Sequence, residues 1–390
     1  MSTTYFESLL LATPILNSLR GEGYVEPTAI QRMAIPPLLE GRDLLGCAQT
    51  GTGKTAAFAL PILQKIHTDP KRLNSKSVRM LVIAPTRELA AQIDASFGTY
   101  GRNVRFGRSC VFGGVSKLSQ VRALNRGVDV LIATPGRLLD LHGEGSVRLD
   151  QVETVVLDEA DRMLDMGFIR DIRRIVALLP KQRQTVLFSA TMPKEIAELA
   201  RSIQNHAVQV AIEPEKTTAD NVDQKIVFVE KSDKRDVLTS MLHGISVERA
   251  LVFTRTKHGA DRLATSLTAN GIMADAIHAN KSQNARTRAL DSFRKGSVRV
   301  LVATDLASRG IDVDGVTHVF NYELPNEAET YVHRIGRTAR AGASGIAVSL
   351  CAPEERPLLK QIEKLIGRPI PTAVDASRRS RHVAGQPRIA

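Results

Sequence analysis

Residues 48–55 of the chain read Ala-Gln-Thr-Gly-Thr-Gly-Lys-Thr. This stretch matches the phosphate-binding loop pattern, except that Ala48 stands where the strict form has glycine. Two glycines would let the backbone wrap closely around phosphate groups, and the start of the following helix would offer them its positive dipole end. We expect Lys54 to reach the β- and γ-phosphates and Thr55 to hold magnesium through its hydroxyl.

Short apolar runs of the kind that form buried parallel strands surround this loop. They cover residues 80–84, 130–133, 154–157 and 185–188, and a second series covers residues 225–229, 250–253, 298–302, 318–321 and 346–350. Longer helical patterns separate the runs, so two α/β units in tandem are expected.

A polar stretch separates the two series and predicts the domain boundaries. Residues 213–220 read EPEKTTAD and break the periodicity, which predicts a linker over residues 214–220 between domains 1–213 and 221–370. Residues 371–390 contain four arginines and one acidic residue, so they are expected to form a disordered basic tail. Such a tail adds nonspecific RNA affinity or only keeps the protein soluble.

A second motif that indicates phosphate chemistry is acidic. The run Val155-Val156-Leu157 ends in Asp158-Glu159-Ala160-Asp161. An acid at the end of a buried strand faces the same sheet edge as the phosphate loop, so Asp158 is placed to hold magnesium and Glu159 to orient or deprotonate the attacking water. The alternative is an acidic helix start that only favours the helix dipole. The phosphate loop a hundred residues earlier favours ATP hydrolysis.

Composition narrows the class of protein. The 390 residues are 43% hydrophobic and 24% charged, which is typical of a globular chain. The net charge of +12 favours a polyanionic partner such as nucleic acid or an anionic membrane surface, and a basic solvated surface is the alternative. Three widely spaced cysteines argue against a disulfide framework or a paired zinc site, and fit a reducing cytoplasm. No run of eighteen apolar residues occurs, so neither secretion nor membrane spanning is expected.

Small residues and threonines follow five of the predicted strands, at residues 84–86, 133–135, 189–191, 253–255 and 303–305. Ligands bind at this carboxyl edge of parallel sheets, and amides with hydroxyls suit phosphate oxygens. Threonine and proline at ordinary strand-to-loop junctions would explain any single case, but five cases in two units favour contacts with phosphate oxygens.

Taken together, these motifs resemble the DEAD-box RNA helicases of superfamily 2, with the bacterial RhlE-like subgroup as the nearest impression. The resemblance spans about residues 6–342 and includes around ten short motifs in the family's order. It implies two RecA-like domains, each a mostly parallel sheet flanked by helices. It also implies ATP and Mg²⁺ as cofactors and RNA as partner. Because nothing in the sequence demands an oligomer, a monomer is expected.

The resemblance assigns the nucleotide site residue by residue. Gln31 would bond the adenine edge, with Phe6 and Tyr24 packed by the base, although Gln31 and Tyr24 can also be read as ordinary helix and packing residues. The full nucleotide-binding set is Phe6, Tyr24, Gln31, Thr50, Gly51, Thr52, Gly53, Lys54, Thr55, Gly310 and Asp312. Ser189 and Thr191, with Asp161, resemble the motif that couples hydrolysis to strand separation.

The second domain resembles the family at residues 331–340, YVHRIGRTAR, where Arg334, Arg337 and Arg340 recur every three residues and would share one helix face. The resemblance implies that Arg337 and Arg340 act as arginine fingers on the γ-phosphate and that His333 contacts the acidic motif. Asp312 would bond the ATP ribose. ATP and RNA would then each favour domain closure, and hydrolysis would release the RNA.

The resemblance also implies an RNA track along both domains. Its residues are Pro85, Thr86, Arg87, Gly113, Gly114, Thr134, Arg137, Thr254, Arg255, Gln283, Arg286 and Thr304. Guanidinium groups, hydroxyls and glycine amides contact phosphate and sugar, so sequence specificity should be low. Ala279, Asn280 and Ala339 depart from the family pattern, which puts close backbone approach at those places in doubt.

The expected activity is RNA-stimulated ATP hydrolysis coupled to local, non-processive unwinding of short RNA duplexes. An ATP-gated RNA clamp, in which hydrolysis times RNA release, would use the same residues. A DNA translocase of the same superfamily is disfavoured by the adenine-reading motif and by the Asp158-Glu159-Ala160-Asp161 form. Ribosomal or mRNA-decay complexes are possible settings, and the sequence does not choose between them.

Overall fold

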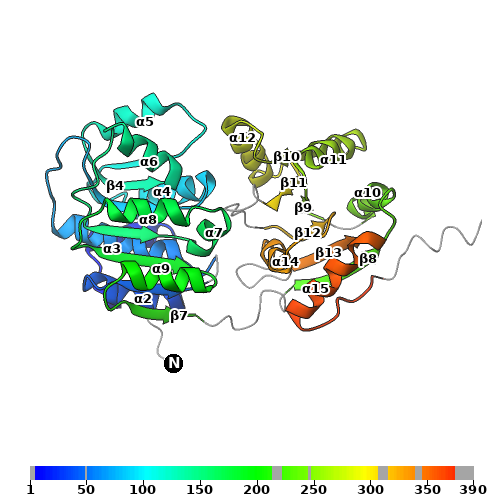
Figure 1. Ribbon diagram of the computed structural model, residues 1–390, viewed down its shortest axis with the longest axis horizontal. Helices are drawn as coiled ribbons and strands as arrows, with labels where there is room; N and C mark the ends of the chain where they lie inside the picture. Colours follow the sequence, from blue (N-terminus) through cyan, green and yellow to red (C-terminus); the bar gives the residue numbers. More distant parts are fainter. Residues whose placement is uncertain are drawn as a thin grey trace, which may run out of the picture. The chain divides into compact units, whose positions relative to one another are not determined.

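The structure is a computed structural model that describes residues 5–48, 51–212, 222–244, 247–305, 315–338 and 345–373. The chain divides into two compact units, Met1–Pro214 and Glu215–Ala390 (Figure 1). The predicted linker 214–220 and most of the predicted tail, residues 374–390, lie outside the described residues. Among the described residues, no helix is both long and apolar enough to cross a membrane.

The first unit alternates strands and helices along the chain. Its strands are β1 (Leu44–Cys47), β2 (Val78–Ile83), β3 (Arg108–Val111), β4 (Val128–Ala133), β5 (Thr154–Leu157), β6 (Gln184–Ser189) and β7 (Val208–Ala211). Its helices are η1 (Phe6–Leu9), α1 (Thr13–Gly21), α2 (Ala29–Leu39), α3 (Lys54–Thr68), α4 (Arg87–Tyr100), α5 (Lys117–Leu124), α6 (Pro135–Gly143), α7 (Ala160–Asp165), α8 (Ile169–Ala177) and α9 (Lys194–Ile203).

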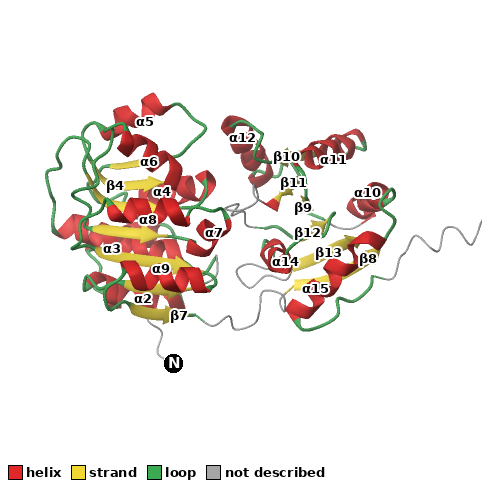
Figure 2. Cartoon of the chain, in the orientation of Figure 1, coloured by secondary structure: helices red, strands yellow, loops and turns green. Residues whose placement is uncertain are grey.

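The first unit is a three-layer sandwich around a seven-stranded sheet of order β3-β4-β2-β5-β6-β1-β7, in which every pair is parallel (Figure 2). Successive residues of a strand serve opposite faces. Met80 and Val82 pack with α2, α3 and α4, whereas Leu81 and Ile83 pack with α6, α8 and α9. Because both faces of β2 are covered, its sequence is apolar throughout.

The second unit repeats the architecture with six strands. They are β8 (Val222–Phe228), β9 (Ala250–Thr254), β10 (Ala274–Ile277), β11 (Val300–Thr304), β12 (His318–Asn321) and β13 (Gly345–Cys351). The helices described here are α10 (Lys234–Gly244), α11 (Lys257–Ala269), α12 (Gln283–Arg294), α14 (Ala328–Ile335), η2 (Pro353–Glu355) and α15 (Arg356–Ile366).

The second sheet has the order β10-β11-β9-β12-β13-β8, again with parallel pairs only. Leu251 and Phe253 of β9 face the core shared with α12, α14 and α15. Val252 faces the opposite core, shared with α10 and α11. The α/β class and the tandem arrangement predicted from the sequence are confirmed.

All nine predicted strands are present, with ends shifted by up to three residues. Four more strands were missed by the sequence prediction: β1, β3, β7 and β10. Three of these lie at sheet edges, and β10 reads Ala-Asp-Ala-Ile and β3 Arg-Ser-Cys-Val. An edge strand needs less apolar surface than a central one, so its sequence signal is weaker.

Candidate functional site

The phosphate loop leads directly into α3. Gly51 and Gly53 have φ values of 87° and 95°, a conformation that glycine adopts without strain. Gly53 is the residue before the first turn of α3, so the amides at this helix start are available to an anion. The Lys54 side chain is buried and its Nζ donates to the Ala48 carbonyl at 2.9 Å. Thr50 lies outside the described residues.

Gln31 of α2 braces this loop. Its Oε1 accepts from the Thr28 backbone N–H at 2.9 Å, and its Nε2 donates to the Gly53 carbonyl at 3.1 Å. A Cβ placed on Gly53 would lie 2.4 Å from this Nε2, so the carboxamide and the loop fit closely. One Nε2 hydrogen and one Oε1 lone pair can still form hydrogen bonds. The adenine contact of Gln31 stays a prediction.

Phe6 and Tyr24 form the aromatic part of the predicted adenine site. Their ring centroids are 6.4 Å apart at an edge-to-face angle of 72°, and Tyr24 makes a second edge contact with Tyr100. Phe6 is buried, whereas Tyr24 is 38% exposed. Tyr24 is therefore the ring that is open to a ligand, while the buried Phe6 packs against it edge to face.

Asp158 follows β5 and is buried, with an Oδ1 that has no hydrogen-bond partner among the described residues. Burial raises the pKa of this carboxyl to about 6, and the nearby Lys54 ammonium opposes the shift. A buried carboxylate oxygen without a partner is costly, so the geometry fits a cation or its hydration shell. Thr55, in the first turn of α3, is half-buried and offers its hydroxyl.

The described residues contain no cluster of three or more His, Cys, Asp or Glu side chains that could hold a metal ion. A magnesium ion bound with a nucleotide does not need such a cluster, because waters and phosphate oxygens fill most of its octahedral positions. The single carboxylate of Asp158 and the Thr55 hydroxyl are the donor set typical of that case.

Glu159 has a left-handed backbone, with φ 57° and ψ 55°, which costs about 1 kcal/mol for a residue with a Cβ. Its Oε2 accepts from Arg162 Nη1 at 2.7 Å, and both side chains are buried. Sequence reasoning missed Arg162, although the three-residue spacing between Glu159 and Arg162 is the signal for such a pair. The arginine holds the proposed base in one position.

Asp161 ties α7 to the end of β6. Its Oδ2 accepts from the Ala190 N–H at 3.1 Å, the Thr191 N–H at 2.9 Å and the Thr191 hydroxyl at 3.0 Å. The Ser189 hydroxyl accepts from the Asp161 N–H and donates to the Thr191 carbonyl. The structure thus brings together the three residues predicted to couple hydrolysis to strand separation.

The RNA residues predicted in the first unit follow β2, β3 and β4, which are neighbours at one end of the sheet. The phosphate loop follows β1, the acidic motif follows β5 and the coupling residue Thr191 follows β6, and these three strands are neighbours in the other half of the sheet. A Cβ on Gly114 would lie 2.0 Å from Arg87 Nη1, so the Arg87 guanidinium lies against the Gly113-Gly114 backbone. Thr86, after Pro85, caps α4 through its hydroxyl, which accepts from the Leu89 N–H at 3.3 Å.

Arg137 has a structural contact that the sequence did not indicate. Its Nη1 donates to Gln120 Oε1 at 2.7 Å and its Nη2 to the Val115 carbonyl at 3.4 Å. Arg137 therefore supports the loop after β3, and its Nε has no hydrogen-bond partner among the described residues. Thr134, at the start of α6, is nearly buried.

In the second unit Thr254 and Thr304 end adjacent strands and are paired in register. Arg255 follows Thr254 at the same sheet edge. Gln283 and Arg286 lie in the first turn of α12, which packs near β10 and β11. The predicted RNA residues of this unit are therefore gathered near the carboxyl ends of β9, β10 and β11.

One expectation about the second unit is wrong. α14 ends at Ile335, so Arg337 lies beyond the helix and does not share a helical face with Arg334. The reason is Gly336, a poor helix former that follows Ile335. Arg337 is buried, with Nε donating to the His333 carbonyl at 3.3 Å.

Arg334, by contrast, is a buried structural residue. Its Nη2 donates to Asp305 Oδ2 at 2.7 Å, its Nη1 donates to the Glu323 carbonyl and Asn321 Oδ1, and its guanidinium lies over the Phe253 ring. Three other predicted residues of this region lie outside the described residues: Gly310, Asp312 and Arg340. Ala339 also lies outside them.

Two protein families match the chain, one in each of the two units. Residues 28–199 match the DEAD/DEAH box helicase family and residues 233–342 match the helicase conserved C-terminal domain. The chain is 43% identical over 386 residues to the DEAD-box ATP-dependent RNA helicase CshA of Bacillus cereus (strain ATCC 10987 / NRS 248), with 99% of this chain and 72% of that protein covered.

A second related sequence and a solved structure are similar to the chain over nearly its full length. The CshA of Geobacillus kaustophilus (strain HTA426) is 41% identical over 391 residues, with 99% of this chain and 82% of that protein covered. The structure of S. cerevisiae Dbp5 bound to RNA and ADP BeF3 has a TM-score of 0.83 and 31% sequence identity, and the match covers 97% of this chain and 98% of that chain.

Proposed function

The chain belongs to the DEAD-box family of ATP-dependent RNA helicases, and from this premise we propose which residues of its own carry the activity. In the first unit, ATP is bound and hydrolysed where β1, β5 and β6 end. The RNA backbone contacts the ends of β2, β3 and β4 in the first unit and of β9 and β11 in the second.

One observation carries the nucleotide assignment. The buried Asp158 carboxylate has an oxygen with no hydrogen-bond partner among the described residues, and it lies at the sheet edge where α3 begins with Lys54. Asp158 would hold the cation of a metal-bound triphosphate through this oxygen, and Lys54 would bind its phosphates. Magnesium would neutralise charge on the β- and γ-phosphates when it is bound.

The chain's own groups then have separate roles. Lys54 exchanges the Ala48 carbonyl for a phosphate oxygen, and Thr55 and Asp158 hold the metal or its water shell. Glu159, held by Arg162, orients the attacking water and accepts its proton. Arg337, Arg340 and His333 of the second unit, and Gly310 with Asp312, keep their predicted roles toward the same nucleotide.

Coupling to RNA is assigned to the Asp161 network. A shift of the acidic motif on hydrolysis would be transmitted through Asp161 to the backbone of Ala190 and Thr191, because the carboxylate is bonded to both amides. Local, non-processive unwinding of short duplexes is the outcome we propose, with ATP and RNA binding cooperatively.

The likenesses to Dbp5 and to the two CshA proteins support RNA as the partner. Contacts made by arginines, hydroxyls and glycine amides support low sequence specificity. The RhlE-like subgroup, the cytoplasmic location, the monomeric state and a place in ribosomal or mRNA-decay complexes stay predictions.

Separation of a short fluorescent RNA duplex tests the proposal. The full chain should separate the strands with ATP and not with ADP, and a DNA duplex of the same sequence should remain paired. Rapid strand separation during a single RNA-binding event would support unwinding. Long ATP-dependent residence on RNA without strand separation would overturn it in favour of the clamp.

A further inference from the structure

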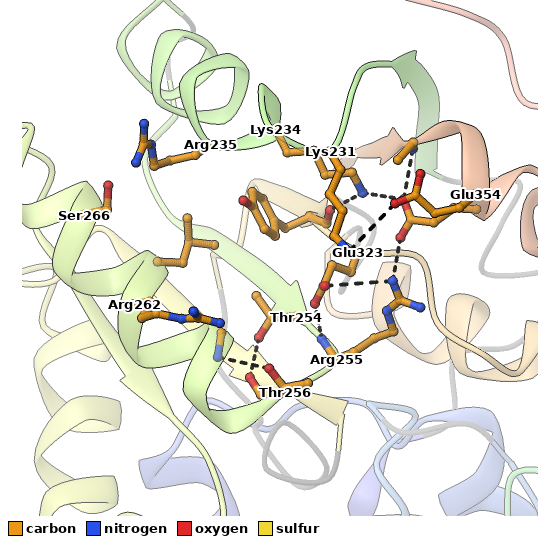
Figure 3. A pocket seen from close by; sticks show the side chains of 15 residues that line it. Lys231, Lys234, Arg235, Thr254, Arg255, Thr256, Arg262, Ser266, Glu323 and Glu354 are labelled. Carbon is orange, nitrogen blue, oxygen red and sulfur yellow. Dashed lines mark hydrogen bonds and ion pairs between the residues drawn. The ribbon is translucent and has the colours of Figure 1, made fainter.

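The second unit contains a cavity of about 300 Å³, and most of the residues that line it have no role in the proposed function. It opens where β9, β12 and β13 end, between the first turns of α10 and α11 (Figure 3). Its wall begins with Thr254 and Arg255, two residues of the predicted RNA track, and continues along α11 to Arg262 and Ser266. The cavity is therefore continuous with the RNA track.

Two of the three acids in the cavity wall, Glu355 and Glu323, are hydrogen-bonded inside the protein, whereas the third, Glu354, is exposed and lies 3.9 Å from Lys231 Nζ. Glu355 is buried, and its carboxylate accepts from Lys234 Nζ, from Arg255 Nη2 at 3.2 Å and from the Ala352 and Leu324 N–H groups. Glu323 accepts from the Arg255 N–H at 2.7 Å. Lys234 also donates to two carbonyls, so the inner wall is a closed network.

This network fixes the Arg255 guanidinium and leaves part of it unused. Among the described residues, carboxylates contact this guanidinium only at Nη2, so the Nε and Nη1 hydrogens have bonding capacity left. Arg262 is exposed, and its one hydrogen bond among the described residues runs from Nε to the His258 carbonyl of its own helix. Arg255 and Arg262 therefore both have N–H groups that donate no hydrogen bond to the described residues.

A third arginine, Arg235, also lines the cavity, and its Nε donates to the exposed Asp236 carboxylate at 2.9 Å. Leu263 and the Tyr322 ring supply apolar wall, and Thr256 and Ser266 supply hydroxyls. Planar guanidinium groups beside hydroxyls and an apolar wall match a phosphate joined to a ribose.

We propose that this cavity binds one phosphodiester of the RNA strand, held by Arg255 and Arg262, so that the RNA contacts of the second unit continue from the end of β9 onto α11. The inference rests on the proposed function, since it extends the same RNA track. An acidic peptide would also suit arginines, but the shared residues Thr254 and Arg255 favour RNA.

Arg262→Glu is the decisive variant, because Arg262 belongs to the cavity and not to the predicted track. Lys360→Glu is the matched control: it makes the same charge change at an exposed residue of α15, on the opposite face of the sheet. Affinity for a fluorescent single-stranded RNA is measured for the full chain with a non-hydrolysable ATP analogue, over a series of salt concentrations. Thermal unfolding confirms that each variant is folded.

We expect Arg262→Glu to weaken RNA binding about tenfold, as for the loss of one charge-assisted contact. The slope of log affinity against log salt should fall by about 0.7, the value for one phosphate of a single strand. Arg262→Ala should show the same direction with a smaller loss of affinity, and Lys360→Glu should match the wild type.

Three outcomes would overturn the inference. Wild-type affinity and salt slope in Arg262→Glu would show that RNA does not enter the cavity, as expected if its ligand were a peptide. Equal losses in Arg262→Glu and Lys360→Glu would show a general charge effect. Absence of ATP-dependent RNA binding by the wild type would instead refute the proposed function itself.

Discussion

Replacing Asp161 by asparagine should free the backbone at the end of β6. One carboxylate oxygen accepts three hydrogen bonds there, from the Ala190 and Thr191 amides and the Thr191 hydroxyl, while the other accepts from the Arg162 N–H at 3.1 Å. An asparagine cannot accept on both sides, because one of its two positions is an NH₂ group. Either orientation places a donor against a donor.

The size of the effect follows from the charge. A hydrogen bond to a charged group contributes about 1.5–3 kcal/mol and a neutral one about 1 kcal/mol, so three bonds together would lose about 3 kcal/mol. The smaller desolvation cost of the neutral amide offsets part of this. We expect a net loss of about 2–3 kcal/mol in the free energy of local opening, which corresponds to roughly 30- to 150-fold faster amide exchange.

Hydrogen–deuterium exchange of the full chain, followed by mass spectrometry of a peptide spanning residues 189–193, measures this directly. Asp171→Asn is the matched control, since it makes the same change at the Arg174 pair on α8. In the same Asp161→Asn protein, fewer RNA strands should be separated per ATP hydrolysed. Unchanged exchange at Ala190 and Thr191 would refute the reasoning, and equal acceleration in Asp171→Asn would show that the effect is not local.

Three further predictions concern the two units separately. Gly53→Ala should lower ATP affinity at least about tenfold in a fluorescent-nucleotide titration, because the new Cβ would clash with Gln31 and the φ of 95° is unfavourable for alanine. Gly271→Ala is the control, because Gly271 has a similar φ but open space around it, and it should leave ATP affinity unchanged. Equal losses of affinity in the two variants would contradict the close fit between Gly53 and Gln31. Arg334→Leu should destabilise the second unit by about 3 kcal/mol, because the buried guanidinium donates to Asp305, to Asn321 Oδ1 and to the Glu323 carbonyl, and all of these bonds are lost. A calorimetric transition at the wild-type temperature would contradict this. Excess EDTA should reduce ATP hydrolysis at least about 100-fold and added Mg²⁺ should restore it; hydrolysis that persists in EDTA would contradict the metal assignment.

The fold was predictable where burial is two-sided. β2 and β4 are covered on both faces, so they appear in the sequence as continuous apolar runs. β10 lies at a sheet edge and contains Asp275, and its sequence alone does not distinguish it from a loop. The end of α14 was misplaced because the regular arginine spacing outweighed the helix-breaking signal of Gly336.

The site was predictable where its chemistry is local in sequence. Lys54 and Asp158 stand in short patterns whose spacing already indicates a nucleotide. The contact between Arg137 and Gln120 joins residues on different helices and has no local signal. The buried network around Glu355 was likewise invisible, because it joins segments about a hundred residues apart in the chain.

Steady-state ATP hydrolysis with magnesium tests the central claim most directly. The wild-type chain and Glu159→Gln are compared without nucleic acid, with single-stranded RNA and with single-stranded DNA. The account predicts strong stimulation by RNA alone, and its loss in Glu159→Gln. Turnover that is independent of RNA, equal stimulation by DNA, or full RNA-stimulated activity in Glu159→Gln would contradict it.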